Sequence, residues 1–499
     1  MDPNQQQQQL HVVFLPFLAQ GHMIPITDMA RLFARHGVKS TIITTPLNAP
    51  LFSGKIDRDA QLGLQIRTHV VEFPAAEAGL PEGCENLSRA NESFEMVVTF
   101  YKSMELLRRP VEELLQQWRP DCLVADFPFH WASESANKLD IPRLYFNATG
   151  SFAMCLCECL NRHQPHTRVE SDSEPFLLPG LPHEIRVTRG RIPGEFRPEV
   201  NDDDPSVKEL RDLMLESEVT SYGVVVNSFY ELEPGYPEHY KHEMGRKAWF
   251  IGPLSLSNKD DMKHKAERGD SAAAIDRHES CLRWLDSKEA NSVIYICFGS
   301  IPIPFNADQL REIAAALETL LSRQISFIWV VKKEEWLPEG FEERITEGGK
   351  GLVIRGWAPQ VLILDHGAIG GFVTHCGWNS TLEGVCAGVP MVTWPLQAEQ
   401  FLNEKLVTDV LKIGVGVGAE EWSIQERKII VGREEIQSAI TRVMVGEEAE
   451  EMRSRARKLK EIAVMANEEG GSSYFDMKLL VQELTDLRDK RNNDGCSKS

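Results

Sequence analysis

The sequence predicts an α/β protein with two doubly wound parallel-sheet domains that face each other across a cleft. Strand-like apolar runs alternate with helical stretches, as in repeated βαβ units. The chain of 499 residues is too long for a single core, and a polar stretch at 252–274 separates two alternating regions. We therefore expect an N-terminal domain at 1–251, a linker at 252–274 and a C-terminal domain from residue 275.

The first region opens with a βαβ unit. LHVVFLPFLAQGH is typical of a buried strand that enters a glycine turn, and IPITDMARLFARHG then has Ile26, Met29 and Phe33 at helical spacing before Gly37. VKSTIITTP supplies the next strand, which implies a parallel pair. Later strand candidates are DCLVADF, PRLYFNAT and YGVVVNSF, with RRPVEELLQQW as a helix.

The second region repeats the alternation. It predicts strands at SVIYICFGS, SFIWVV, GLVIRGW, GGFVTH and PMVTWP, with helices at NADQLREIAAALETL and STLEGVCAG. Residues 432–487 are mostly helical in pattern, and KRNNDGCSKS reads as a loose tail. Ligands of such sheets bind at the carboxyl ends of the strands, so the strand-to-helix turns are the candidate sites.

Composition narrows the possible functions. The net charge of −20 disfavours binding to phosphate backbones or anionic lipid, and we find no basic patch that would offset it. The sequence has no run of 18 apolar residues and starts without a basic, cleavable leader, so we expect a cytoplasmic protein that does not insert into membranes. The ten cysteines are expected to be reduced, and CLCEC at 155–159 to be ordinary packing.

The turn FVTHCGWNST, residues 372–381, carries unusual chemistry for a strand-to-helix junction. Asn379 and Ser380 fall at the predicted helix start, where free N–H groups and the helix dipole favour an anion. His375 and Ser380 can donate further hydrogen bonds to a phosphate. A capping box between Ser380 and Glu383 is the structural alternative, although it requires neither His375 nor Trp378.

Two flanking motifs favour a nucleotide sugar at this turn. WAPQ at 357–360 offers an aromatic ring for a base, and PLQAEQ at 395–400 offers carboxylate and amide groups for sugar hydroxyls. The whole stretch, WAPQVLILDHGAIGGFVTHCGWNSTLEGVCAGVPMVTWPLQAEQ, closely resembles the signature of plant secondary-product UDP-glycosyltransferases, and PFLAQGHMIP and VIYICFGS resemble other parts of that family. The resemblance covers the whole chain. It implies the GT-B fold of two Rossmann-like domains, with the second at 275–475 and a C-terminal helix at 476–499 that crosses back to the first domain and ends in the loose tail.

The resemblance also assigns the donor-binding residues. Enzymes of the family that use UDP-glucose favour glutamine at the position of Gln400. Trp378 stands where many glucuronosyltransferases have a basic residue, and Gln397 lies at a position that varies in the family. The implied donor-site residues are Trp357 on uracil, Gln360 and Glu383 on ribose, Ser300, His375, Asn379 and Ser380 at the diphosphate, Trp378, Glu399 and Gln400 at the sugar, and Ala358 within the same motif.

A candidate general base lies in the first domain. His22 is expected in the turn after the first strand, and Asp126 ends the apolar run DCLVAD. A single loop histidine is more often a surface residue. An imidazole held by a carboxylate is, however, a good general base near neutral pH, and these two residues match the catalytic pair of the family.

The implied reaction is an inverting displacement. His22 removes a proton from an acceptor hydroxyl, the oxygen attacks the anomeric carbon opposite UDP, and the helix start near residues 379–380 stabilises the leaving diphosphate. We expect neither a metal nor another cofactor. NDDDPS, with its acidic residues 202–204, is interpreted as a solvated turn and not as a metal motif, and IGVGVG at 413–418 as a strand and not as a phosphate loop.

The predicted function is therefore a UDP-glucose-dependent O-glucosyltransferase that acts on a hydroxyl or carboxyl of a flavonoid, a triterpenoid or steroid sapogenin, or a simple phenolic. Phe127, Phe129 and Phe152 would either wall the acceptor pocket or belong to the core. We expect a monomer that binds a UDP-sugar and a lipophilic acceptor, without nucleic acid. A sugar-nucleotide sensor without turnover is the alternative, while a dehydrogenase lacks its dinucleotide fingerprint and a serine hydrolase lacks G-x-S-x-G.

Overall fold

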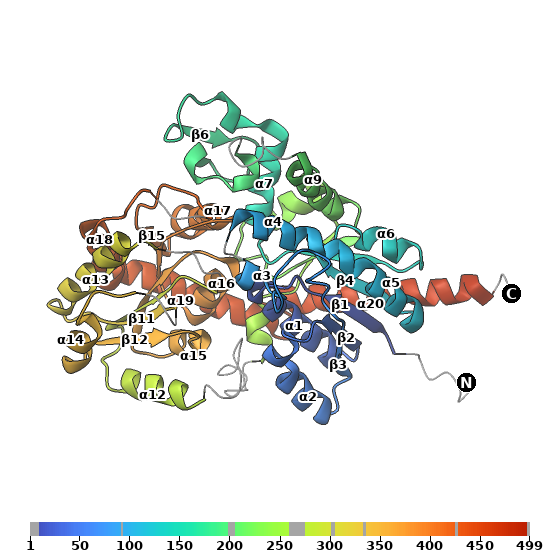
Figure 1. The fold of residues 1–499 in the computed structure, drawn as a ribbon, viewed down its shortest axis with the longest axis horizontal. Coiled ribbons are helices and arrows are strands. Elements are labelled where there is room, and N and C mark those ends of the chain that lie inside the picture. Colours follow the sequence, from blue (N-terminus) through green and yellow to red (C-terminus); the bar gives the residue numbers. More distant parts are fainter. Residues whose placement is uncertain are drawn as a thin grey trace.

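The computed structural model describes residues 9–90, 93–197, 205–258, 275–300, 305–332, 336–424 and 428–496. Within these ranges, two parallel sheets flanked by helices form the two halves of the molecule (Figure 1). The prediction of an α/β fold with two doubly wound sheets is confirmed. The acidic turn at 202–204 lies outside the described residues, as does most of the predicted linker. The division into domains at 251 and 275 stays a prediction.

The first sheet has the order β3-β2-β1-β4-β5-β8-β9 in the described residues, and its paired strands are parallel. The order reverses between β1 and β4, so the segments that follow these two strands diverge and leave a crevice at their carboxyl ends. The strands are β1 (His11–Leu15), β2 (Lys39–Thr44), β3 (Ile66–Val70), β4 (Cys122–Asp126), β5 (Arg143–Phe146), β8 (Gly223–Val226) and β9 (Ala248–Phe250).

The second sheet has the order β12-β11-β10-β13-β14-β15 in the described residues and is also parallel. Its order reverses between β10 and β13, whose ends lie side by side with Cys297 opposite Thr374. The strands are β10 (Val293–Cys297), β11 (Ser326–Val331), β12 (Gly351–Arg355), β13 (Ile369–Thr374), β14 (Met391–Thr393) and β15 (Gly414–Gly416). The last of these lies in IGVGVG, which confirms the strand interpretation.

Helices cover both sheets, as doubly wound folds require. None of the described helices is both long and apolar enough to cross a membrane. The helices of the first half are α1 (Gln20–Arg35), α2 (Ser53–Gln61), α3 (Leu87–Ala90), α4 (Phe94–Ser103), α5 (Arg108–Trp118), α6 (Ala132–Asn137), α7 (Ser151–His163), α9 (Pro205–Val219) and α10 (Tyr236–Glu238). Those that follow are α12 (Ile275–Asp286), α13 (Ala307–Leu321), α14 (Phe341–Glu347), α15 (Gln360–Leu364), α16 (Trp378–Ala387), α17 (Gln400–Lys405), α18 (Arg433–Met444), α19 (Glu447–Asn467) and α20 (Ser472–Cys496).

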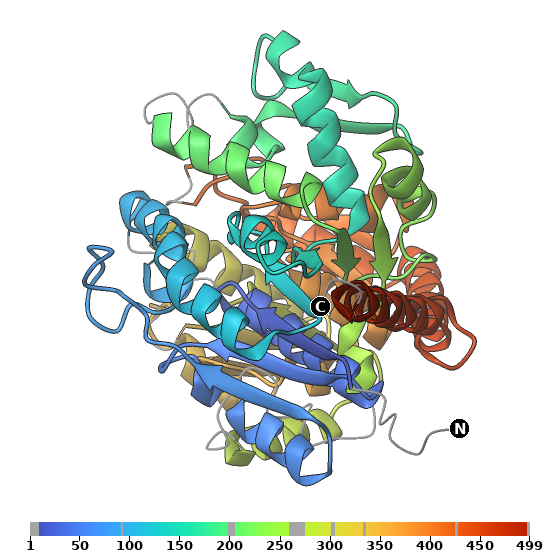
Figure 2. The same ribbon diagram turned by 90° about the vertical axis from the view of Figure 1, so that its right-hand side faces the viewer.

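The two halves share buried apolar surface. One hydrophobic cluster includes Phe152 of α7 and Tyr236 of α10 from the first half, together with Trp378 and Leu382 of α16 from the second. Figures 1 and 2 place α7, α9 and the hairpin of β6 (Pro175–Leu178) and β7 (Ile185–Thr188) together on one side of the molecule, next to this junction. The shared core fixes the two sheets relative to each other.

Helix α20 returns from the second half to the first. Met477, Leu480 and Leu484 are buried in the core of the first sheet, and Phe250 of β9 donates its backbone N–H to Asp476 at 2.7 Å. The helix extends to Cys496, so residues 490–496 are helical and not part of a loose tail as predicted, while the last three residues lie outside the described ranges. Arg491 pairs with Asp121 at 2.6 Å, and this contact holds the end of the helix against the first half.

Candidate active site

His22 and Asp126 meet at the switch point of the first sheet. Asp126 ends β4 and is 0% exposed, and His22 Nδ1 lies 2.9 Å from Asp126 Oδ2. His22 stands in the first turn of α1 and not in the preceding turn as predicted, because the helix begins at Gln20. Both residues therefore lie at the carboxyl ends of β1 and β4, where a doubly wound sheet binds its ligand.

Backbone donors hold the Asp126 carboxylate in place. Phe17 donates its N–H to Oδ2 at 3.1 Å, and Phe127 donates its N–H to Oδ1 at 2.9 Å. A carboxylate so fixed accepts the Nδ1–H of His22, which leaves the lone pair on Nε2. The pair is therefore arranged as a general base, because Nε2 can take a proton while Asp126 stabilises the imidazolium.

Aromatic side chains surround this base. The rings of Phe17 and Phe127 lie 5.3 and 5.4 Å from the His22 ring, and Tyr101 of α4 stacks on Phe17 at 5.0 Å. Burial, followed by the charges of Glu195, Asp126 and Glu399, raises the pKa of the Tyr101 hydroxyl, so that it stays protonated. The base therefore lies beside a flat apolar wall.

Of the three phenylalanines considered from the sequence, only Phe127 borders the base. Phe129 and Phe152 are both 0% exposed. The first packs on Trp131 in a core of the first half, and the second packs on Tyr236 in the cluster that the two halves share. Sequence reasoning missed Tyr101, because its helix has an ordinary amphipathic pattern and no motif around it indicates a site.

The turn at the end of β13 has the geometry of an anion site. Helix α16 begins at Trp378, two residues earlier than predicted, with Gly377 as its N-cap. The first intrahelical hydrogen bond runs from Thr381 N to Gly377 O, so the N–H groups of residues 378–380 lie at the open end of the helix. The capping-box alternative is wrong, since Gly377 occupies the cap position and Ser380 lies within the first turn.

Ser380 and Glu383 belong instead to one polar network with Gln360. Gln360 Nε2 donates to Ser380 Oγ at 3.1 Å and to Glu383 Oε2 at 2.7 Å, and Tyr295 donates its hydroxyl to Gln360 Oε1 at 3.3 Å. The Ser380 hydroxyl accepts in this network and so keeps its own hydrogen for a ligand. Three of the predicted donor-site residues are therefore assembled from two helices.

His375 lies beside this helix start without a partner for one ring nitrogen. Among the described residues, its Nδ1 is buried and makes no hydrogen bond, which is costly unless a ligand meets it. Burial lowers the pKa of His375 to about 4, so the ring is neutral and presents one N–H. The ring packs against Gly299 and Gly377, where an added Cβ would come within 2.5 Å of Nε2, and Ser300 directly follows Gly299.

Two residues of the same turn contact the first half. Asn379 Nδ2 donates to Gly21 O at 2.6 Å, and Trp378 Nε1 donates to Asn227 O at 2.8 Å. The Trp378 ring is 2% exposed and packs so closely on Gly150 that a Cβ there would meet it at 2.5 Å. The side chains predicted to contact sugar and diphosphate thus make interdomain contacts, and their backbone N–H groups remain at the helix start.

The segment 396–400 forms a second turn, which carries Glu399 and Gln400. Gln400 Oε1 accepts the N–H groups of Leu396 and Gln397 at 2.9 and 3.0 Å, so the amide nitrogen is the end that can donate to a sugar. Burial raises the pKa of the Glu399 carboxyl, against smaller opposing effects that include the nearby His22. Glu399 of the second half therefore lies close to the proposed base of the first.

Asn403 links the two turns and was not predicted. It is 0% exposed and donates to Cys376 O at 2.9 Å and to Glu399 Oε1 at 3.0 Å. Cys376 has a φ of 63°, a strained value that such a bond helps to hold.

Trp357 and Ala358 follow β12. Trp357 is partly exposed and Ala358 is buried. Gly356, with a φ of 95°, turns the chain between the strand and Trp357.

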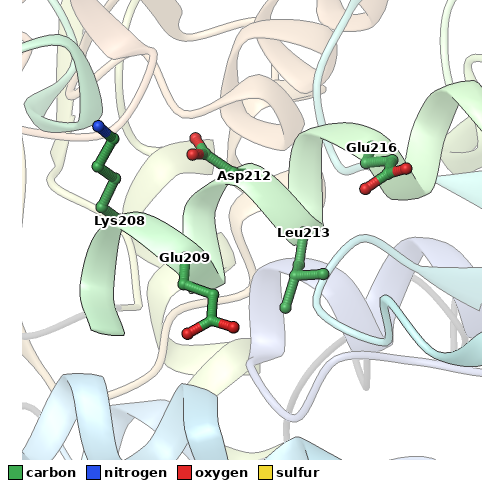
Figure 3. Close-up of a pocket in the computed structure, with 5 residues that line it drawn as sticks. All are labelled: Lys208, Glu209, Asp212, Leu213 and Glu216. Atoms are coloured by element: carbon green, nitrogen blue, oxygen red, sulfur yellow. The ribbon is translucent and has the colours of Figure 1, made fainter. Parts of the chain in front are cut away.

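No other part of the described chain has a comparable arrangement. Its described residues contain no group of three or more His, Cys, Asp and Glu side chains that could hold a metal ion, and Cys155, Cys157 and Cys159 are free thiols. A shallow pocket of about 340 Å³ runs along α9, lined by Lys208, Glu209, Asp212, Leu213 and Glu216 (Figure 3). These side chains are exposed and come from one helix face, so the pocket is a solvated surface feature.

Comparisons with known proteins agree with this geometry. The sequence model of the family UDP-glucoronosyl and UDP-glucosyl transferase matches residues 267–447. Scopoletin glucosyltransferase of Nicotiana tabacum is 52% identical over 96% of this chain and 98% of its own, and UDP-glucose flavonoid 3-O-glucosyltransferase 7 of Fragaria ananassa is 52% identical over 96% and 97%. The crystal structure of Glycyrrhiza uralensis UGT73P12 complexed with glycyrrhetinic acid 3-O-monoglucuronide is 42% identical, with a TM-score of 0.90 over 98% of each chain. That of Medicago truncatula UGT71G1 complexed with UDP-glucose is 26% identical, with a TM-score of 0.75 over 96% of this chain and 98% of that one.

Two facing Rossmann-like sheets with a helix-start anion site on one and a His–Asp pair on the other define a glycosyltransferase of the GT-B fold. The chain belongs to the plant family of UDP-glycosyltransferases, as identity of about half over nearly its whole length establishes. The resemblance found in the sequence is confirmed.

Proposed function

We propose that this enzyme transfers glucose from UDP-glucose to a hydroxyl of a lipophilic plant metabolite, with inversion at the anomeric carbon. The observation that carries the proposal is the hydrogen bond of 2.6 Å from Asn379 Nδ2 to Gly21 O. It joins the first turn of α16 to the residue that precedes His22. The proposed base and the proposed diphosphate site are therefore neighbours across the two halves.

In this mechanism, His22 Nε2 removes the proton of the acceptor hydroxyl while Asp126 stabilises the imidazolium. The acceptor oxygen attacks the anomeric carbon, and the bond to the UDP oxygen breaks on the opposite face. Negative charge that develops on the diphosphate is stabilised by the N–H groups at the start of α16, by the Ser380 hydroxyl and by His375. An α-linked donor would give a β-glycoside.

The remaining donor contacts follow from the network around α15 and α16. We propose that Trp357 stacks on uracil beside Ala358, that Gln360 and Glu383 meet the ribose, and that Ser300 lies near the diphosphate. Glu399 and the amide nitrogen of Gln400 would bind sugar hydroxyls, since the Gln400 oxygen is already occupied by backbone donors. The name of the Fragaria ananassa relative, UDP-glucose flavonoid 3-O-glucosyltransferase 7, includes UDP-glucose, which supports glucose as the transferred sugar here.

A phenolic acceptor fits the surroundings of the base best. Phe17, Tyr101 and Phe127 present aromatic rings beside His22, and such rings favour a flat aromatic ligand. The relatives are named for scopoletin and for flavonoids, and the Glycyrrhiza uralensis enzyme is complexed with glycyrrhetinic acid 3-O-monoglucuronide. We further propose, from the acidic composition and the fold, a metal-independent monomer of the cytoplasm.

The test is product formation with a panel of acceptors. The protein would be incubated with UDP-glucose and a coumarin phenol, a flavonol or a sapogenin, and products identified by mass spectrometry and by the anomeric proton coupling in NMR. We expect a β-glucoside and one UDP per product. Tight UDP binding without any glycoside would overturn the proposal in favour of a sensor protein, and an α-glycoside would overturn the inverting mechanism.

A further inference from the structure

Residues 420–423, here called the strap, connect the two halves on the side of the β6–β7 hairpin. Trp422 donates its backbone N–H to Gly190 O at 3.0 Å, and its ring lies over Gly194, where an added Cβ would meet the ring at 2.2 Å. Arg197 reinforces the contact by donating to Trp422 O at 3.5 Å. The strap is thus seated on the segment that follows the hairpin in the first half.

Glu195 of that segment lies near two residues of the candidate site, Tyr101 and Glu399. Its carboxyl pKa is raised by burial and, with a smaller contribution, by the charge of Glu399. The Glu195 charge also raises the pKa of Tyr101, after burial, so the segment borders the aromatic wall beside the base. Residues 190–197 therefore lie on the side of the first half that carries Tyr101.

The other face of the strap contacts the turn 396–400 of the second half, which carries the proposed sugar-binding residues. Trp422 Nε1 donates to Ala398 O at 3.0 Å, and Ser423 N donates to Leu396 O at 3.1 Å. Ala398 has a φ of 49°, which is a strained value for a residue with a Cβ. Glu399 and Gln400 follow it directly, so the position of the Ala398 carbonyl determines where both side chains point.

We propose that Trp422 is a positioning residue that holds the turn 396–400 in its sugar-binding conformation by bracing it against residues 190–197 of the first half. The inference rests on the proposed function, because it assigns this turn to the donor sugar. Loss of the indole N–H frees the Ala398 carbonyl, and the strained turn then relaxes. The uracil, ribose and diphosphate contacts lie on other elements and are unaffected.

The test compares the affinity of the full chain for UDP and for UDP-glucose by calorimetry. In Trp422→Phe, which keeps a ring over Gly194 but removes the N–H, we expect UDP-glucose affinity to fall about three- to tenfold while UDP affinity changes by less than about twofold. Trp284→Phe is the matched control. Trp284 is also partly buried, its ring lies under Lys288 at 4.5 Å, and it precedes β10 at the opposite end of the strands from the cleft.

A second variant approaches the same contact from the other half. Gly194→Ala places a methyl group against the Trp422 ring without altering the second half, and we expect the same selective loss of UDP-glucose affinity. Gly54→Ala on α2 is its control, because an added Cβ there meets only Arg58 Nη1 at 4.0 Å. Thermal unfolding confirms that each variant is folded.

The outcomes separate the two proposals. A selective loss in Trp422→Phe and in Gly194→Ala, with both controls unchanged, supports the positioning role. An equal loss of UDP and UDP-glucose affinity, or no loss in either variant, overturns it while leaving the proposed function intact. If the unaltered protein binds neither ligand, the donor assignment itself is wrong, and the role of Trp422 is overturned with it.

Discussion

The two halves of the active site are built in opposite ways. In the second half, nearly all proposed donor contacts come from the continuous stretch 357–400, and many of them involve backbone groups at a helix start. In the first half, the groups around the base are single side chains from α1, α4, the end of β4 and the segments that follow β1 and β4. A site built from one continuous backbone segment can be recognised as a motif in the sequence. A site built from side chains that lie far apart along the chain cannot.

The largest expected effect is that of His22→Ala, which should abolish the function of the first half of the site and spare that of the second. Removal of the base should lower kcat by about 10²- to 10⁴-fold, the usual contribution of a general base. UDP affinity should stay within about twofold, since the diphosphate contacts lie in the other half. Product assays and calorimetry measure the two quantities. Normal turnover would disprove the base assignment, and a matching loss of UDP affinity would show that the halves are not separable.

The same contrast explains how much the sequence could predict. The alternation of apolar runs predicted both sheets. The stretch 357–400 indicated a donor site through its strand-turn-helix pattern, and its resemblance to the glycosyltransferase signature assigned the residues. The start of α16 was misplaced because Ser380 and Glu383 have the spacing of a capping box, while Gly377 makes the cap through its backbone alone. The partners of Trp378 and Tyr101 were unpredictable, since Asn227 and Phe17 lie far away along the chain.

Trp378→Phe tests whether this residue belongs to the donor site or to the junction. The change removes a buried hydrogen bond to Asn227 O, which leaves that carbonyl unpaired and should cost about 1–3 kcal/mol in the free energy of unfolding. Urea denaturation measures the loss. The KM for UDP-glucose should change by less than about threefold. A large rise in KM with unchanged stability would restore the sugar-contact role predicted from the sequence.

Glu399→Gln confines the perturbation to the second half. Asn403 can still donate to the remaining carbonyl oxygen, so the turn is kept, but a charged acceptor for sugar hydroxyls is lost. We expect UDP-glucose affinity to fall about tenfold and UDP affinity to be retained. Because burial already raises the pKa of Glu399, the neutral amide should leave stability unchanged or slightly higher. Equal loss of both ligands would place Glu399 at the diphosphate instead.

His375 provides a pH-dependent effect on stability that belongs to the second half alone. Burial lowers its pKa from 6.5 to about 4, so between these values the unfolded chain binds a proton that the folded protein does not. The resulting stability is complete above pH 6.5 and is lost as the pH falls toward 4. His375→Gln should therefore lose about 2 kcal/mol less stability than the unaltered protein between pH 7 and pH 5 by urea denaturation. Parallel losses in both proteins would show that His375 titrates normally.

The smallest expected effect is that of metal removal, and it tests what balances the charge of the diphosphate. The start of α16 directs the N–H groups of residues 378–380 at that position, and neutral His375 adds one more donor. These groups can stabilise the leaving diphosphate without a divalent cation, so the rate should be the same after exhaustive dialysis against EDTA and after Mg²⁺ or Mn²⁺ is added back. A rate lost with EDTA and restored by one cation would mean that the helix start is insufficient. The donor half would then require ligands beyond the stretch 357–400, and the two halves would differ less in how they are built.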